Sequence, residues 1–271
     1  MDKITVLSLF PQMITDALSY GIVKRATNLI TITSRDLRDW GLGDYKKVDD
    51  TSVAPGPGML FRADVVANAI IDVKKEDTDA YIIHMSPRGI PLNSKKAKEL
   101  SQKKHLVILA SRYEGLDQRV INNYVDEEIS IGDYVLSGGE LASLVLIDSV
   151  LRMTGNVLRM DAVEEESFQQ GLLEYPHYTK PLKFENKEIP EYLRSGNHQL
   201  IQNNRFLEQL FVTWLRRPDL LRDYPLCNIH VQNKNPLTKL KKQNILLQKR
   251  LNAFEKVIRE NRDVRRFKKD N

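Results

Sequence analysis

The chemistry that the sequence suggests first lies in residues 131–140, a polar stretch with three glycines and two carboxylates. This stretch leads directly into an apolar run over 141–151, which indicates a loop that opens a helix. Glycine allows close backbone approach, and the first amide groups of a helix have no partner within the helix. The pattern therefore predicts a small-molecule pocket, with an ordinary strand-to-helix turn as the alternative.

The expected ligand is not a nucleoside triphosphate or a dinucleotide. Neither G-x-x-x-x-G-K-[ST] nor G-x-G-x-x-G occurs in the 271 residues. The loop holds Asp133 and Glu140, and an acidic run lies shortly before it at 126–128. Because these carboxylates would repel a polyanion, a cationic or zwitterionic ligand fits better.

Two further candidates for catalysis have structural alternatives. The acidic cluster Glu164, Glu165 and Glu166 could supply a carboxylate base, but such a cluster more often marks the start of a helix. Arg152 ends the apolar run, where a cation is favourable beside a helix C-terminus in any case. The five histidines show no metal-ligand spacing, and a single cysteine excludes an intrachain disulfide and a cysteine-rich zinc site.

Alternating apolar and amphipathic segments predict the elements that would position these residues. Strands are expected at 4–10, 30–34, 80–85 and 105–110, and helices at 16–26, 94–102, 141–151 and 198–214. Strands that alternate with helices indicate an α/β fold with a parallel sheet, which binds ligands at the carboxyl ends of its strands. Three turn-rich segments would converge there, namely 85–89, 111–115 and 131–139.

Charge is unevenly distributed along the chain. Residues 234–271 hold thirteen basic and four acidic side chains, a local balance of +9 within a total of +5, which leaves about −4 for residues 1–233. Apolar residues at helical spacing predict a basic amphipathic helix over 237–260, which either attracts RNA or packs on the protein as a solvated helix. The N-terminal apolar stretch is too short for a membrane span and lacks a signal-peptide cleavage pattern, so a cytoplasmic protein is expected.

Collinear motifs extend along the first 221 residues. They include ITVLSLFPQM at the start, MSPRG at 85–89, SRYEGLDQRV at 111–120, DEEISIGDYVLSGGELA at 126–142, EEESF at 164–168 and GLLEYPHYTKP at 171–181. Together they resemble the bacterial tRNA (guanine-N1)-methyltransferases of the knotted SPOUT superfamily. The resemblance implies a parallel sheet with a deep trefoil knot and a smaller C-terminal helical domain. The implied boundaries are 1–158 for the knotted domain, 159–166 for a linker and 167–271 for a helical tRNA-binding domain with a basic tail.

The resemblance also implies S-adenosylmethionine as the methyl donor and places it against the three turn-rich segments. The implied cofactor residues are Ser86, Pro87, Ser111, Tyr113, Glu114, Gly115, Ile131, Gly132, Asp133, Tyr134, Val135, Leu136, Ser137, Gly138 and Gly139. Two positions depart from the family, which usually has glycine at Ser111 and tyrosine at His84. The family further implies magnesium, although no motif in this sequence indicates a metal site.

The reaction implied is methylation of N1 of guanosine 37, next to the tRNA anticodon. Guanine N1 carries a proton at neutral pH, so a base must remove it and a cation must stabilise the charge that develops on O6. Glu166 matches the family's aspartate base, and Arg152 matches its arginine.

The expected partners are the tRNA anticodon stem-loop and a second copy of the chain. Asp49, Asp50 and Arg205 are the expected RNA contacts, and the homodimer would share its active sites between subunits. Two alternatives stay open: a catalytically weakened SPOUT-type RNA-binding homologue, and a methyltransferase that acts on another RNA purine.

Overall fold

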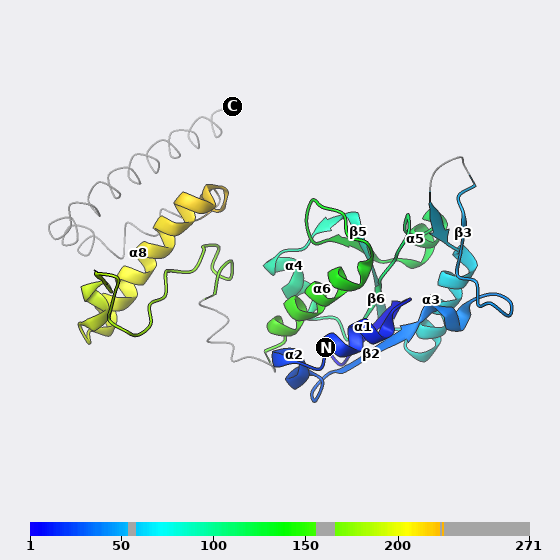
Figure 1. Ribbon diagram of the computed structural model, residues 1–271, viewed down its shortest axis with the longest axis horizontal. Coiled ribbons are helices and arrows are strands. Elements are labelled where there is room, and N and C mark those ends of the chain that lie inside the picture. Colours follow the sequence, from blue (N-terminus) through cyan, green and yellow to red (C-terminus); the bar gives the residue numbers. More distant parts are fainter. Residues whose placement is uncertain (54–57, 156–165, 223, 225–271) are drawn as a thin grey trace, which may run out of the picture. The chain divides into compact units, whose positions relative to one another are not determined.

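The computed structural model describes residues 1–53, 58–155, 166–222 and 224 (Figure 1). Its contacts divide the chain into two compact units, Met1–Val163 and Glu164–Asn271. Apart from Glu166, the expected linker at 159–166 lies outside the described residues, as does the basic helix expected at 237–260. The domain boundaries drawn from the sequence therefore stay predictions.

A five-stranded sheet with the order β2-β1-β6-β5-β7 forms the centre of the first unit (Figure 1). Its strands are β1 (Lys3–Ser8), β2 (Thr31–Asp36), β5 (Ala80–Pro91), β6 (His105–Leu109) and β7 (Glu127–Ser130). Every neighbouring pair is parallel, which confirms the predicted parallel sheet.

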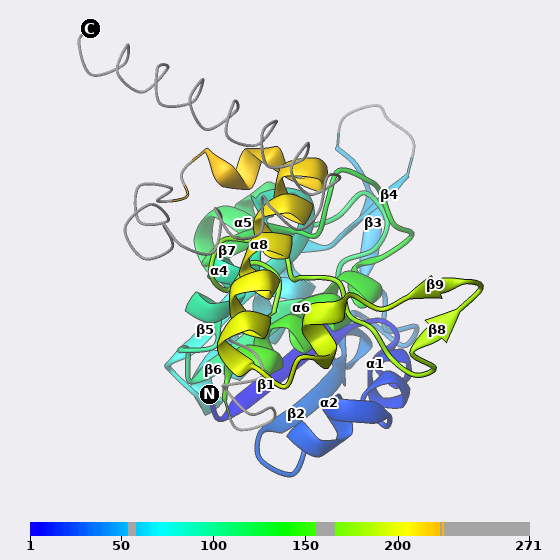
Figure 2. The ribbon, with the colours of Figure 1, turned by 90° about the vertical axis from the view of Figure 1, so that its left-hand side faces the viewer.

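Successive side chains of the central strands enter two separate cores, one on each face of the sheet. In β6, Leu106 and Ile108 pack on one face, and Val107 and Leu109 pack on the other. The first face is covered by α1 (Pro11–Ala17), α2 (Gly21–Ala26), α4 (Ser94–Leu100) and α6 (Gly139–Met153) (Figure 2). The second face is covered by α3 (Ala63–Glu76), α5 (Gln118–Tyr124) and the short 3-10 helix η1 (Leu37–Trp40).

Two of the predicted elements are wrong in detail. The single helix expected at 16–26 is two helices, because the chain turns after α1 and Gly21 adopts a φ of +62°. The turn expected after Met85 is instead an irregularity within β5, whose pairing with β7 shifts register between Met85 and Ile90. The strand therefore continues beyond the predicted end and includes residues 86–89.

The sequence-based prediction lacks several elements of this unit, among them α3, α5 and β7. In β7 the two glutamates obscure the strand pattern, because they lie at a sheet edge where basic side chains can pair with them. The unit also contains a hairpin of β3 (Asp49–Thr51) and β4 (Met59–Phe61). The amide of Glu114 donates to the carbonyl of Met59 at 3.0 Å, so the hairpin is attached to the segment that follows β6.

The second unit contains α8 (His198–Arg216), which confirms the predicted C-terminal helix. The side chain of Asn197 accepts a hydrogen bond from the amide of Leu200 and so caps its first turn. Leu172, Leu210 and Leu221 form a small core beside this helix. The unit also has a two-stranded hairpin of β8 (Lys183–Phe184) and β9 (Lys187–Glu188), and 3-10 helices η2 (Glu191–Arg194) and η3 (Pro218–Leu221).

Within the part of the chain that the structure describes, no helix has both the length and the apolar character needed to cross a membrane.

Candidate functional site

A cavity of about 760 Å³ opens where β5, β6 and β7 end. Its walls come from all three turn-rich segments that the sequence predicted to converge. Every predicted cofactor residue lines the cavity except Asp133, which is exposed and lies outside the lining. The volume lies within the roughly 300–1,000 Å³ typical of small-molecule sites.

The glycine-rich loop is held closely against the end of β6. The amide of Gly139 donates to the carbonyl oxygen of Ser111 at 2.7 Å. A Cβ atom at residue 139 would lie only 2.8 Å from the Cα atom of Ala110, so the close approach requires glycine. At the other end of the loop, Gly132 adopts a φ of +147°, which L-residues with side chains rarely adopt. The backbone of the loop therefore forms one wall of the pocket.

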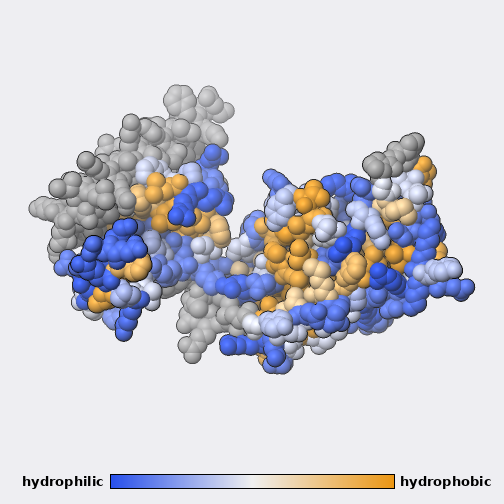
Figure 3. All heavy atoms as spheres, viewed as in Figure 1, coloured by the Kyte–Doolittle hydropathy of each residue, from blue (hydrophilic) through white to orange (hydrophobic). Residues whose placement is uncertain are grey.

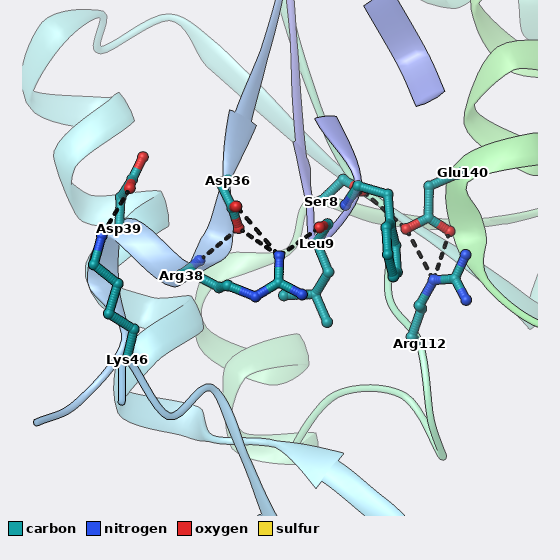
Figure 4. Close-up of polar contacts among 9 residues, drawn as sticks. Ser8, Leu9, Asp36, Arg38, Asp39, Lys46, Arg112 and Glu140 are labelled. Atoms are coloured by element: carbon teal, nitrogen blue, oxygen red, sulfur yellow. Dashed lines mark hydrogen bonds and ion pairs between the residues drawn. The ribbon is translucent and has the colours of Figure 1, made fainter. Parts of the chain in front are cut away.

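An ion pair fixes the base of this loop (Figure 4). Glu140, in the first turn of α6, is 1% exposed and accepts from Arg112 Nε at 3.1 and 3.2 Å. The Ser8 hydroxyl at the end of β1 donates to the same carboxylate at 2.9 Å. The Arg112 guanidinium also lies over the Phe10 ring, 4.2 Å from its centroid. The contacts join the carboxyl ends of β1 and β6 to the start of α6.

A second chain of hydrogen bonds reaches the pocket from β7. The Glu128 carboxylate lies 3.0 Å from His84 Nδ1, and His84 Nε2 lies 2.8 Å from the Ser111 hydroxyl. The hydrogen bond from His84 holds the pKa of the Glu128 carboxyl below its usual value, against the opposing effect of burial. Glu128 is therefore ionised at neutral pH. The two departures from the family pattern at the expected cofactor site, His84 and Ser111, are thus in direct contact.

Four of the five carboxylates that were expected to repel a polyanion have partners within the protein. Glu127 lies 2.8 Å from Lys96 Nζ, and Asp126 accepts from the amide of Ile82 at 2.7 Å. Glu128 and Glu140 are also hydrogen-bonded, whereas Asp133 is exposed. The shape and the polar groups of the pocket decide its ligand.

The two predicted catalytic residues lie in different units. Arg152 is in the last turn of α6, a position in which a cation also interacts favourably with the helix dipole. Glu166 is half-buried in a bend of the second unit, and its backbone carbonyl accepts from the amide of Gln169 at 3.4 Å. Their catalytic roles stay predictions.

The predicted RNA contacts have partners within the protein. Asp50 pairs with Lys47 and Arg62, each at 2.9 Å, and the hydrogen bond from Lys47 is the main reason why the pKa of its carboxyl is lowered. Asp49 lies in β3 and contributes, after burial, to the raised pKa of the Tyr113 hydroxyl at the pocket.

Arg205 in α8 places its guanidinium over the Tyr175 ring, 4.6 Å from the centroid. Its buried Nε has no hydrogen-bond partner among the described residues. The cation is therefore held by an aromatic ring within its own unit.

Several lining residues were not singled out in the sequence. Ser52, Val53 and Leu60 come from the β3–β4 hairpin, whose pairing leaves no simple sequence signal. Arg88 and Arg112 also line the cavity. They lie in the motifs at 85–89 and 111–120, in which only adjacent residues were predicted to bind the cofactor. His84 was noted in the sequence as a departure from the family pattern, but not as a lining residue.

No three histidine, cysteine, aspartate or glutamate residues within the described ranges are grouped so as to hold a metal ion.

Residues 2–223 match the family model described as tRNA (Guanine-1)-methyltransferase TrmD. A tRNA (guanine-N(1)-)-methyltransferase from Pseudoalteromonas translucida is 45% identical over 225 residues, which cover 82% of this chain and 88% of the relative. A protein of the same name from Staphylococcus haemolyticus is 40% identical, covering 83% of this chain and 92% of the relative. Because the family model spans most of the sequence, the chain belongs to the tRNA (guanine-N1)-methyltransferase family.

Proposed function

We propose that the protein transfers a methyl group from S-adenosylmethionine to N1 of guanosine 37, next to the anticodon of tRNA. As a member of its family, it is an S-adenosylmethionine-dependent tRNA (guanine-N1)-methyltransferase. The observation that carries the proposal is the meeting of all predicted cofactor residues but one in a single cavity. We infer from this cavity where the methyl donor binds, and from the family pattern which base is methylated.

The pocket has the features that the methyl donor requires. The backbone of residues 131–139 offers amide and carbonyl groups, and Ile131 and Leu136 provide apolar surface next to the core. Ser86, Ser111 and Glu114 add polar groups for the hydroxyl and amino groups of a nucleoside with an amino-acid tail. When bound, S-adenosylmethionine supplies an electrophilic methyl group on a sulfonium centre.

Two side chains of the protein are proposed to remove the proton from guanine N1 and to stabilise the charge that develops on O6. The Glu166 carboxylate accepts the N1 proton, so that the N1 lone pair becomes available for methylation. The Arg152 guanidinium stabilises the negative charge that develops on O6. The family also implies magnesium, and within the described residues no three histidine, cysteine, aspartate or glutamate side chains are grouped to hold it.

The proposed assembly is a homodimer with shared active sites, formed on a knotted first domain. Leu141 and Val145 of α6 are each nearly half exposed, and Figure 3 shows apolar side chains gathered where α6 lies in Figure 1. An apolar surface of this kind is a suitable contact for a second subunit. Asp49, Asp50 and Arg205 are proposed to contact the anticodon stem-loop. Asp50 would then leave Lys47 and Arg62 and accept hydrogen bonds from the RNA.

The test is methyl transfer to matched tRNAs. The purified protein is incubated with S-adenosylmethionine labelled on its methyl group and an unmodified tRNA that carries guanosine at position 37, beside the same tRNA with adenosine there. Label on the guanosine transcript alone is expected. Label on neither transcript would contradict the proposal and favour an RNA-binding homologue, whereas label at another purine would favour the second alternative.

The base is tested separately. Glu166→Gln should lower turnover by about a hundredfold or more and leave cofactor affinity unchanged, because general-base catalysis contributes on the order of 10²–10⁴ in rate. Glu188→Gln, at an exposed ion pair with Arg194 in the same unit, is the matched control. Full turnover of Glu166→Gln would eliminate Glu166 as the base.

A further inference from the structure

The first unit contains two hydrogen-bonded chains with the same order of chemical groups: carboxylate, imidazole, hydroxyl. The pocket relay consists of Glu128, His84 and Ser111, with separations of 3.0 and 2.8 Å. The core relay consists of Asp77, His105 and Thr5, with separations of 2.9 and 3.0 Å. Both histidines are buried, and in both relays Nδ1 faces the carboxylate and Nε2 faces the hydroxyl.

The carboxylates determine the tautomers. The carboxyl pKa values of Glu128 and Asp77 are both lowered, so at neutral pH each carboxylate accepts the hydrogen bond and the Nδ1 atom of its histidine carries the proton. A neutral ring in this tautomer leaves Nε2 as an acceptor. The hydroxyl group must then donate its hydrogen to Nε2 and has only lone pairs left for other partners.

The two hydroxyls differ in what lies on their other side. In the core relay, the Thr33 hydroxyl lies 3.3 Å from the Thr5 hydroxyl, so a second partner is provided inside the protein. In the pocket relay, Ser111 is half-buried and lines the cavity. The pocket relay therefore ends at a residue in the wall of the cavity.

We infer that the pocket relay makes Ser111 a specificity-determining residue, whose hydroxyl accepts a hydrogen bond from an amino or hydroxyl group of the bound nucleoside. The inference rests on the proposed function, since it assigns a polar contact within the same cofactor pocket. Glu128 and His84 act through Ser111 as positioning residues. They keep the Ser111 hydrogen directed away from the ligand, so that a ligand donor at this place does not meet another donor.

The charged groups around the relay are Glu128 on β7 and Arg88, whose Nη2 lies 3.8 Å from the same Glu128 oxygen. Arg112 follows Ser111 directly and is already paired with Glu140.

The test measures the affinity of S-adenosylhomocysteine by calorimetry near pH 8. Ser111→Ala should bind about fivefold more weakly, since one hydrogen bond is worth about 1 kcal/mol. Glu128→Gln, which no longer fixes the tautomer, should also bind more weakly. In the Ser111→Ala background, Glu128→Gln should have little further effect.

His105→Gln is the matched control, because it removes the imidazole of the core relay and leaves the pocket intact. It should keep the wild-type affinity. The inference would be overturned if Ser111→Ala bound S-adenosylhomocysteine with wild-type affinity. A wild-type protein that did not bind S-adenosylhomocysteine would overturn both this inference and the proposed function.

Discussion

Each end of the parallel sheet contains a hydrogen-bonded relay of carboxylate, imidazole and hydroxyl, but the surroundings of the two relays differ. At the amino ends of the strands, the core relay is closed: Asp77 and Thr33 satisfy its two ends, and Thr5 is completely buried. At the carboxyl ends, the pocket relay stops at the cavity wall. The difference arises from the sheet itself, because the segments that follow parallel strands diverge and leave a space at that end. Identical chemistry therefore stabilises the fold at one end and is available to a ligand at the other.

The largest effect should come from the ion pair that supports the carboxyl ends. Glu140→Gln removes the negative charge from a buried site and leaves Arg112 without its counter-ion. We expect a loss of about 3 kcal/mol in the free energy of unfolding, measured by denaturant titration. Glu76→Gln at the exposed pair with Arg35 should cost at most about 1 kcal/mol. Equal losses in the two variants would show that Glu140 is no more important than a surface partner.

The core relay should affect stability without affecting binding. His105→Gln leaves the buried Thr5 hydroxyl and the Asp77 carboxylate imperfectly paired. The expected loss is about 2 kcal/mol of unfolding free energy, with the S-adenosylhomocysteine affinity unchanged within about twofold. A large change in affinity would mean that the two ends of the sheet are coupled, and the comparison would then fail.

The pH dependence of stability should separate the two relays. Burial lowers the pKa of the His105 imidazole below its usual 6.5. The contribution of His105 is therefore complete above about pH 6.5 and is lost as the pH falls through the folded-state pKa. The free energy of unfolding cannot change with pH by more than about 1.4 kcal/mol per pH unit on this account, because one proton is involved. In His105→Gln this decline should be absent.

The Glu128 carboxyl should affect the free energy of unfolding at lower pH than His105 does. Its pKa is lowered from 4.5, so its stabilising contribution is present above about pH 4.5 and is lost as the pH falls further. Glu128→Gln should therefore flatten the stability curve only in this lower range. A change near pH 6 in Glu128→Gln stability would contradict the assignment of the lower window to this carboxyl.

The smallest effect is expected at the hydroxyl that closes the core relay. Thr33→Val keeps the shape of the side chain and removes only the partner of Thr5. We expect a loss of about 0.5 kcal/mol in unfolding free energy, because this contact is long and partly exposed, and no change in ligand affinity. A loss above about 2 kcal/mol would show that Thr33 is an essential part of the core.

The sequence predicted the parallel sheet, α6 and the meeting of three segments, because these depend on apolar runs and glycine positions. It did not predict β7, whose Glu127 and Glu128 are acceptable in a strand only because Lys96 and His84 lie beside them. Partners distant in sequence leave no local signal. For the same reason the contact between His84 and Ser111 could not be predicted, although both residues stood out individually. Pairings of this kind depend on strand order, which periodicity does not determine.

The most direct test of the comparison is a spectrum of the protein with ¹⁵N-labelled histidine side chains, recorded with and without S-adenosylhomocysteine. The signals of His84 and His105 can be assigned with His84→Gln and His105→Gln. Near pH 8, both rings should carry their proton on Nδ1, and the ligand should shift the Nε2 signal of His84 while that of His105 stays in place. A proton on Nε2 of His84, or ligand shifts of equal size at both rings, would contradict the account.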